Sequence, residues 1–574
     1  MTPAKSLDKI YADVADGLAR LLADNKNLVC VLLALNLPLF VHVFMTVEYR
    51  PLAVTDAVIF ALVAAELLAE IFVATLVLKR LPKVFTRVFV LLAAIFFLLD
   101  AATLTLYKSL FDKGMFQVLL DTNPQEAAEY LRDNFTVNVA KIFYVVPLAA
   151  IVGLCFKGAK FFVDFLLARN LRVVRCVMIF GLVTLLAVPP LLIDMPVPKG
   201  ALSVVRMAIL IPRAVNEIRE YREIYANLDA AKIEITRNES DLPFVIFILG
   251  EATNRNHMGI YGYDKPTTPN LQRRLDAGDL IVFTDCVSGA TETMPSCQRM
   301  FTFFRNEIKG DGRPWYTYTN LFDILKAAGY HTAWLSNQEI TGIYGNVPRA
   351  YADRCDEKKF TTPHDTETTV YEFDEKILPL LDESLSKNSS AKNFYVLHLL
   401  GTHLNYRARY PDEFDVFRPE DETSKDPLQR EYRAAYDNAV LYNDFIVEQI
   451  IERFADKDAL IVYVADHGEN VFEDGEHLGH SPNPDKWQLE IPALVWLSDE
   501  CKAKRPELLK KISAAKNRPF MTDDLIHALL DLLKIHTPEF DSRKSLFSDD
   551  FDATRKRIYK GREYRDGQLI TIGE

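Results

Sequence analysis

Hydrophobic and polar residues follow two different patterns along this chain, one before and one after about residue 200. The first part contains five long apolar runs, at 27–47, 54–78, 84–106, 139–156 and 174–193. About 20 apolar residues in a helix cross the hydrocarbon core of a bilayer, and five such runs exceed what a soluble core needs. The pattern therefore predicts a transmembrane domain with five helices at residues 1–195.

The pattern changes at about residue 242, where short apolar runs of strand length alternate with amphipathic stretches. We expect strands at 244–249, 280–283, 332–335, 394–400, 460–465 and 492–497, and helices between them, for example at 321–328 and 436–454. Continuous runs of Val, Ile and Leu separated by helices are typical of a mostly parallel sheet covered on both faces. The sequence therefore predicts an α/β domain at 242–574, preceded by bridging helices at 196–241.

Charge divides the chain at the same place. The 574 residues are 49% hydrophobic and carry a net charge of −12, and the mean hydropathy is +0.01. Residues 1–200 have 19 Lys and Arg against 16 Asp and Glu, a net of +3, and residues 201–574 have 47 against 62, a net of −15. The apolar content excludes a disordered chain, and the acidic second part argues against a nucleic-acid partner.

Lys and Arg are unevenly distributed among the segments that flank the apolar runs. The N-terminal tail has four of them, the second loop four and the fourth loop five, whereas the first loop has only Arg50. Because positively charged segments stay in the cytoplasm, we expect a cytoplasmic N-terminus and an exported second part, in the periplasm of a bacterium. Glu66 and Glu70 lie inside the second run, where a carboxylate either has a function or faces other helices.

Polar residues follow four of the predicted strands directly. They are Gly250-Glu251, Ser336-Asn337-Gln338, Gly401-Thr402-His403 and Asp466-His467-Gly468-Glu469. In an open α/β sheet the carboxyl ends of the strands form the edge at which ligands bind. The sequence therefore predicts a site at this edge.

The residue types at this edge suit a metal ion. Glu251, Asp466 and His467 offer carboxylate and imidazole donors, which fit Zn²⁺ or Mn²⁺, although an Asp-His pair can also be a hydrogen-bonded cap. The segment 288–296 is rich in hydroxyl groups and could open a helix, whose N-terminus favours anions. A hydroxyl beside a metal suits phosphoryl or sulfuryl transfer, and spacing alone does not choose among these hydroxyls.

Short motifs along the whole chain resemble those of a known family. They are Gly250-Glu251, Tyr261-Gly262-Tyr263, Thr267-Thr268-Pro269, Met300-Phe301, Gly401-Thr402-His403, Arg409-Tyr410-Pro411, Tyr436-Asp437-Asn438 and Asp466-His467-Gly468-Glu469. The chain resembles the bacterial phosphoethanolamine transferases, inner-membrane enzymes of the alkaline phosphatase/sulfatase superfamily that include lipid A-modifying and colistin-resistance enzymes. The resemblance implies five membrane helices followed by a periplasmic sulfatase-like domain.

The resemblance also implies roles for individual residues. Zinc would be held by Glu251, Thr293, Asp466 and His467, with Thr293, rather than Thr291, as the nucleophile. His403 would bind the transferred phosphate or its leaving group. A second histidine would do the same, and its two candidates are His477 and His480. Asn337 and Gln338 match a position that contacts the phosphoethanolamine head group. Glu126 matches a substrate-binding Glu, with a plain helix cap as the other interpretation.

The reaction implied by the resemblance is a two-step transfer. Phosphoethanolamine passes from the membrane lipid phosphatidylethanolamine to Thr293, and then to core heptose or a lipid A phosphate of lipopolysaccharide. We expect a monomer that meets its donor within the membrane, with no nucleic-acid partner. The alternatives are a glycerol-phosphate transferase of the lipoteichoic-acid-synthase type, a sulfatase-like hydrolase and a non-enzymatic scaffold.

Two departures from the family pattern concern cysteine. Gly289 and Arg299 occupy positions where the lipid A enzymes have cysteines, which makes the chain look more like the enzymes that modify core heptose. Cys286 and Cys297 lie in the exported part, where disulfides can form, and a bond between them would close a short loop around the hydroxyl-rich segment. Sequence alone does not establish this pairing.

Overall fold

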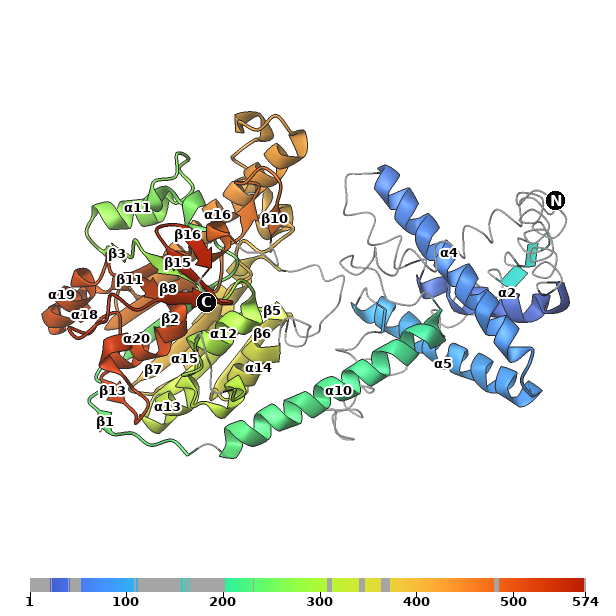
Figure 1. Cartoon of the computed structure of the whole chain (residues 1–574), viewed down its shortest axis with the longest axis horizontal. Helices are drawn as coiled ribbons and strands as arrows, with labels where there is room; N and C mark the ends of the chain where they lie inside the picture. Colours follow the sequence, from blue (N-terminus) through green and yellow to red (C-terminus); the bar gives the residue numbers. More distant parts are fainter. Residues whose placement is uncertain are drawn as a thin grey trace. The chain divides into compact units, whose positions relative to one another are not determined.

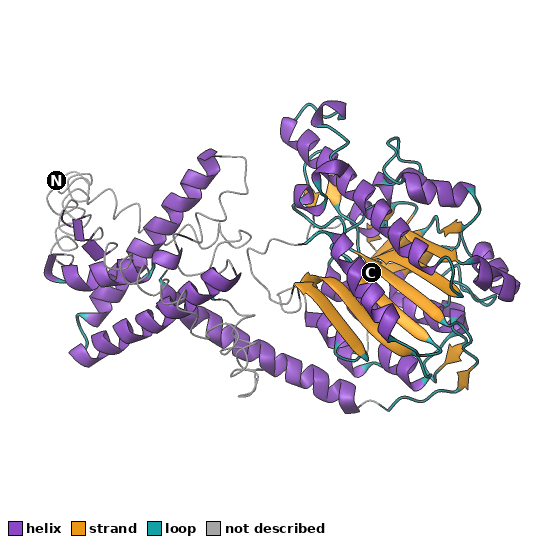
Figure 2. Cartoon of the chain, turned by 180° about the vertical axis from the view of Figure 1, so that it is seen from behind, coloured by secondary structure: helices purple, strands orange, loops and turns teal. Residues whose placement is uncertain are grey.

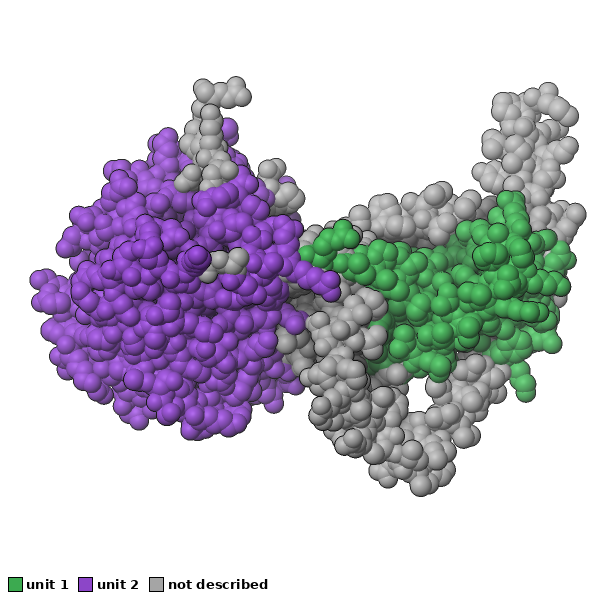
Figure 3. Space-filling model, turned by 90° about the horizontal axis from the view of Figure 1, so that it is seen from below, with its two compact units in different colours: residues 1–220, 364–370 green, residues 221–363, 371–574 purple. Residues whose placement is uncertain are grey.

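The computed structural model describes two compact units of the chain. The described residues are 21, 23–39, 41, 53–107, 110–111, 156–157, 160–161, 164, 202–230, 232–306, 312–339, 346–362, 372–479 and 485–571. Unit 1 comprises Met1–Glu220 with His364–Val370, and unit 2 comprises Tyr221–Pro363 with Tyr371–Glu574 (Figure 3).

Unit 1 is helical wherever it is described at length. Its helices are α2 (Lys26–Leu35), α4 (Ala53–Leu78), α5 (Lys83–Tyr107) and the first part of α10 (Ser203–Ala230). The second and third apolar runs of the sequence coincide with α4 and α5. Among the described residues, one segment, Lys83–Ala101, is long and apolar enough to cross a membrane. Apart from Phe156, the runs at 139–156 and 174–193 lie outside the described residues, so five helices remain a prediction.

Polar side chains of unit 1 bind the backbone where α10 begins. Glu70 accepts a hydrogen bond from the backbone N–H of Leu202 at 2.5 Å, and Asn36 accepts one from the N–H of Ser203 at 2.8 Å. The first N–H groups of a helix have no partner within the helix, so these two side chains cap α10. Glu70 therefore faces another helix in this structure.

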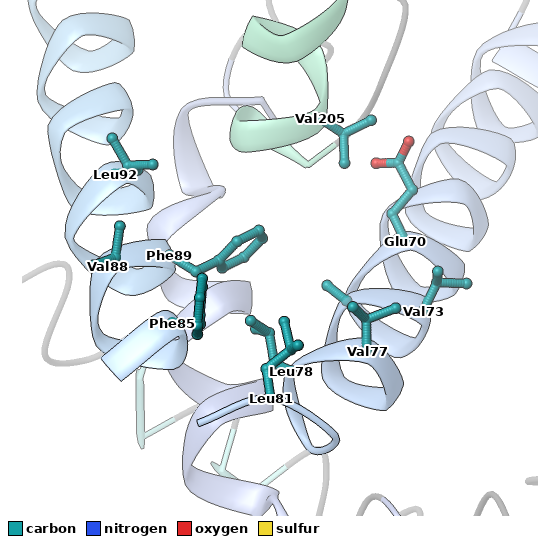
Figure 4. A pocket seen from close by; sticks show the side chains of 11 residues that line it. Glu70, Val73, Val77, Leu78, Leu81, Phe85, Val88, Phe89, Leu92 and Val205 are labelled. Carbon is teal, nitrogen blue, oxygen red and sulfur yellow. The ribbon is translucent and has the colours of Figure 1, made fainter. Parts of the chain in front are cut away.

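A hollow with apolar walls lies between α4, α5 and the start of α10 in unit 1 (Figure 4). Its volume is about 540 Å³, and Figure 4 shows Phe85, Phe89, Leu78 and Val77 around it. Glu70, at its rim, is the one charged residue among those that line it. Such a surface favours contact with apolar groups over water.

Unit 2 is built on a seven-stranded sheet (Figures 1 and 2). The strands lie in the order β3-β11-β8-β2-β7-β5-β6, and they are β3 (Leu280–Val282), β11 (Ala493–Leu497), β8 (Ala459–Ala465), β2 (Phe244–Gly250), β7 (Asn393–His398), β5 (His331–Glu339) and β6 (Glu357–Thr362). Strand β2 is central and pairs in parallel with both β7 and β8. All six predicted strands are therefore present in one sheet.

Both faces of this sheet are covered by helices, as Figure 2 shows. On β2, Val245, Phe247 and Leu249 join one hydrophobic cluster with residues of α12 (Thr293–Met300), α13 (Leu321–Ala327) and α20 (Leu525–Leu532). Ile246 and Ile248 point to the other face and join residues of α15 (Ile377–Lys387) and α16 (Pro427–Phe454). A strand buried on both faces explains the continuous apolar run in the sequence.

The prediction of a mostly parallel sheet is confirmed: β8, β2, β7, β5 and β6 are parallel neighbours, and one strand of the seven runs the other way. Strand β11 runs antiparallel to both β8 and β3. The chain that leaves β8 supplies residues at the carboxyl edge, and a strand that starts from that edge runs back antiparallel without a crossover. The sheet also has an edge strand, β6, that the apolar pattern does not reveal, because it contains Lys358 and Lys359; charged residues are common on edge strands.

Candidate active site

Strand register brings Glu251 and Asp466 to the same point of the sheet edge. Gly250 of β2 is paired with Ala465 of β8, so the next residue of each strand is a carboxylate. The backbone N–H of Asp466 donates to the carbonyl of Gly250 at 2.9 Å, and the Asp466 carboxylate accepts from the N–H of Ala252 at 3.0 Å. These contacts hold the two strand ends together.

Three side chains at this edge form a buried acidic and imidazole group. One ligand atom from each of Glu251, Asp466 and His467 lies within 4.8 Å of the others. His467 Nε2 is 3.3 Å from Glu251 Oε1 and 3.4 Å from Asp466 Oδ2. All three residues are fully buried. The three residues that the sequence offers as metal donors therefore lie together at this edge.

Thr293, the first residue of α12, lies beside this buried group. Its hydroxyl donates to the Glu251 carboxylate, and Oγ1 lies 3.2 Å from each carboxylate oxygen. The Thr291 hydroxyl instead lies 2.9 Å from the hydroxyl of Tyr559. The two threonines therefore face different surroundings, and Thr293 is the one that meets the carboxylate.

The two polar residues near the end of β5 also take different directions. Gln338 donates from Nε2 to Glu251 Oε2 at 2.8 Å and to the carbonyl of Leu399 at 3.1 Å. Asn337 donates instead to the Asp374 carboxylate at 2.8 Å and to the carbonyl of Glu372. The structure thus places Gln338 at the site, whereas the described contacts of Asn337 hold the loop that contains Asp374.

The predicted histidines differ in their surroundings. His403 is half-buried and lies close enough to Glu251 and His467 to interact with their charges, and burial lowers its pKa to about 4. The His477 side chain is exposed and binds the Asp474 carboxylate. His480 and Glu126 lie outside the described residues. Among the described histidines that sequence analysis singled out for phosphate binding, His403 is therefore the one near the group.

His398 is at the site although sequence analysis did not single it out. It is the last residue of β7, its Nε2 is 4.0 Å from Glu251 Oε2, and its Nδ1 is 3.3 Å from the hydroxyl of Ser336. Burial lowers the pKa of His398 to about 4, which favours the neutral imidazole. The available signal was a lone histidine within an otherwise apolar strand.

Charge within the buried group is not balanced by protein alone. Burial opposes ionisation of Glu251, but its hydrogen bond and charge interaction with His467 bring the pKa of Glu251 below its usual value. Burial and the neighbouring Glu251 charge raise the pKa of Asp466, and Asp466 Oδ2 has no hydrogen-bond partner among the described residues. Two carboxylates thus compete for one imidazolium, so these residues fit a divalent cation.

Glycine is required where two loops pack against this group. At Gly401, φ is +54°, and a Cβ atom would lie 2.7 Å from the carbonyl oxygen of Glu251. At Gly468, directly after His467, a Cβ atom would lie 2.3 Å from the carbonyl oxygen of Trp487. Both contacts are with backbone, which cannot rotate away as a side chain can.

The two positions at which the family pattern has cysteines are neighbours in space. A Cβ atom at Gly289 would lie 3.1 Å from Cδ of Arg299, and Asn306 links the two by accepting from Arg299 Nε and donating to the carbonyl of Gly289, both at 2.6 Å. The suggested bond between Cys286 and Cys297 is absent, since both are buried free thiols. A side-chain bridge through Asn306 therefore joins these positions here.

The chain matches two family models. Residues 243–535 match the model described as Sulfatase, which covers the sheet and the buried group. Residues 66–193 match the model described as Phosphoethanolamine transferase EptA/EptB.

Individual relatives agree with these matches. The phosphoethanolamine transferase EptC of Escherichia coli (strain K12) is 30% identical over 336 residues, which cover 57% of this chain and 56% of that protein. The chain thus matches little more than half the length of the EptC relatives. The phosphoethanolamine transferase CptA of Salmonella typhimurium is 27% identical over 526 residues, which cover 84% of this chain and 86% of that protein.

A solved structure resembles unit 2. It is the crystal structure of the C-terminal periplasmic domain of EptC from Escherichia coli in complex with Zn. It is similar with a TM-score of 0.53 at 27% sequence identity, and the match covers 60% of this chain and 96% of that one.

Replacement of Asp466 by Asn should remove bound metal without unfolding the protein. Removing a residue that only supports a metal ligand commonly lowers metal affinity 10- to 100-fold. Removing a ligand itself should therefore lower the affinity at least about tenfold. Because the substitution also relieves repulsion between two buried carboxylates, the metal-free protein should unfold at no lower temperature. Elemental analysis of the full chain in detergent measures the metal content. The control is Asp412→Asn, at an exposed site. Equal metal content in both variants would contradict the assignment of Asp466 as a metal ligand.

Gly468→Ala should destabilise unit 2 and weaken metal binding together. The new Cβ atom meets backbone at 2.3 Å, so we expect a loss of about 2 kcal/mol, as for other overpacked sites. The matched control is Gly278→Ala, where φ is +76° and nothing lies within 4 Å of the new Cβ; it should cost about 1 kcal/mol and leave metal content unchanged. Denaturant unfolding with and without added zinc compares them, and equal effects of the two changes would refute the packing argument.

Proposed function

Because the chain belongs to the sulfatase family, we propose that it is a metal-dependent phosphoethanolamine transferase. The observation that carries this proposal is the contact of the Thr293 hydroxyl with both oxygens of Glu251, 3.2 Å away, beside Asp466 and His467. The match of residues 66–193 and the names of EptC and CptA support phosphoethanolamine as the group transferred.

The proposal extends to a donor and an acceptor. The donor is phosphatidylethanolamine, and the acceptor is lipopolysaccharide, at core heptose or at a lipid A phosphate. A membrane domain at residues 1–195, a bridge at 196–241 and a periplasmic catalytic domain at 242–574 would keep the enzyme beside its lipid donor in the inner membrane. Tethering of this kind raises the effective concentration of the donor.

The metal would be zinc, held by Glu251, Thr293, Asp466 and His467. The Zn complex of the EptC domain supports this choice, as does the mixed carboxylate and imidazole donor set. When bound, the metal lowers the pKa of the Thr293 hydroxyl and offsets negative charge on the phosphoryl group. Gln338 fixes the orientation of the Glu251 carboxylate through its hydrogen bond at 2.8 Å.

The transfer proceeds in two steps at Thr293. In the first, a bond forms between Thr293 Oγ1 and phosphorus as the bond from phosphorus to the glycerol oxygen breaks, and diacylglycerol leaves. The departing oxygen takes a proton from a histidine; His403 is the described candidate, since the anionic phosphate would favour its protonated form. In the second step, an acceptor oxygen attacks the same phosphorus as the bond from phosphorus to Thr293 Oγ1 breaks. The histidine takes up the acceptor's proton, and Thr293 regains from solvent the proton that it released before the first step.

The other candidate functions fit less well. A sulfatase-like hydrolase of the formylglycine type needs Cys or Ser at the nucleophile position, and threonine cannot form that aldehyde. A glycerol-phosphate transferase would share the catalytic group, but the family match of residues 66–193 favours phosphoethanolamine. His477 and His480 remain candidates for the later histidine, and Asn337 and Glu126 for substrate binding.

Thr293→Ala should abolish phosphoethanolamine transfer. Loss of a nucleophile removes the covalent route, so we expect a decrease of at least about a thousandfold. The chain, expressed in a Gram-negative host, should add phosphoethanolamine to lipid A or to the lipopolysaccharide core, as detected by mass spectrometry. The control is Thr284→Ala, an exposed threonine that bonds Asn517. Addition to neither acceptor by the unmodified chain, or full transfer by Thr293→Ala, would contradict the proposal.

A further inference from the structure

A second cleft in unit 2 lies beside the first turn of α12. Its volume is about 900 Å³, and it is lined by Glu292 and Pro295, which flank the nucleophile position Thr293 in the sequence. Residues far along the chain form its other walls, among them Lys544 and Lys560. The cleft therefore adjoins the proposed nucleophile without using the residues of the metal group.

The walls of this cleft carry an excess of positive charge. Two carboxylates, those of Glu292 and Glu539, line it with five cationic side chains, those of Arg299, Arg305, Arg313, Lys544 and Lys560. Of these, Arg305 also lies 3.9 Å from the buried carboxylate of Asp524. This concentration occurs in the part of the chain, 201–574, whose net charge is −15. A polyanion would be repelled by most of such a surface and attracted to this place.

The two lysines of the cleft, Lys544 and Lys560, can bind a ligand. Among the described residues, neither Lys544 nor Lys560 has a carboxylate within ion-pair distance; Lys560 lies over the ring of Tyr559, 5.3 Å from its centre. Burial lowers the pKa of Lys544, as does the charge of Arg305, while the charges of Asp524 and Asp541 act in the opposite direction. An anion entering the cleft would supply the ion-pair partner that these two lysines lack among the described residues.

Arg299 is held in a fixed orientation at the same cleft. Its guanidinium donates to the carbonyl of Pro295 at 2.8 Å and to Asn306 at 2.6 Å, and lies over the ring of Phe304 at 5.0 Å. A planar guanidinium fixed in this way is suited to phosphate oxygens, and lysines add mobile point charges. The cleft thus combines one rigid cation with flexible ones.

We propose that this cationic cleft binds a phosphate group of the anionic acceptor glycolipid and holds the acceptor beside Thr293. The inference rests on the proposed function and assigns the acceptor side of that reaction. A phosphoethanolamine head group carries an ammonium that cancels its phosphate charge, whereas lipopolysaccharide is polyanionic. The charge excess therefore matches the acceptor better than the donor.

The test separates the two halves of the reaction in the full chain, in mixed micelles. The variant Lys544→Gln/Lys560→Gln removes two charges and no ion pair, and Lys560→Gln alone changes only an exposed side chain. We expect release of diacylglycerol from phosphatidylethanolamine to stay within twofold of the unmodified chain. The KM of the double variant for purified lipopolysaccharide should rise about tenfold, as for loss of a charged hydrogen bond. The control is Lys425→Gln/Lys510→Gln, at exposed sites outside the cleft.

A binding measurement keeps this inference separate from the proposed function. Lipopolysaccharide should bind Thr293→Ala, which cannot turn over, and should bind Thr293→Ala/Lys544→Gln/Lys560→Gln at least tenfold more weakly. Equal affinities, or an unchanged KM, would overturn the inference even if transfer occurs. An equal loss in diacylglycerol release would assign the bound phosphate to the donor and overturn it as well. Weakened binding without any diacylglycerol release would refute the proposed function and leave the cleft assignment standing.

Discussion

The carboxylate of Glu251, completely removed from water, is the constraint on which the architecture of unit 2 depends. An ionised carboxylate in the interior is costly unless charges and hydrogen bonds compensate it. Here His467 supplies a charge, Thr293 and Gln338 supply donors, and His398 stands 4.0 Å away. Each comes from a different element, so the register of β2 with β7 and β8 and the start of α12 must all be correct for the carboxylate to be satisfied.

The close approach of the loops follows from this constraint. Gly401 and Gly468 have no side chain where a Cβ atom would collide with backbone, and both adjoin residues of the buried group. Backbone therefore packs closely against Glu251 at Gly401 and against Trp487 at Gly468, and the Glu251 side chain is fully buried. A dry site strengthens every electrostatic interaction within it, which is the property that phosphoryl transfer requires.

Sequence reasoning located the strands and most of the metal-type residues because both depend on local pattern. Apolar runs predict buried strands, and polar residues that follow them predict the edge of the sheet. It did not reveal two features that tertiary context decides. The direction of β11 is set by its connection from β8, and the charged strand β6 is tolerated because it lies at an edge. Side-chain direction is equally unreadable from sequence, so Gln338 reaches Glu251 while its neighbour Asn337 binds Asp374, and His398 was hidden in an apolar strand.

Two sites in unit 2 act in the proposed transfer. The fully buried carboxylate group takes part in the covalent step, and the cationic cleft binds the anionic acceptor. Both depend on Thr293 as the residue that carries the transferred group. Mass spectrometry of peptides from the full chain, incubated with phosphatidylethanolamine and no acceptor, measures this directly. The account predicts phosphoethanolamine on Thr293; modification of Thr291, or diacylglycerol release with no modified threonine, would contradict it.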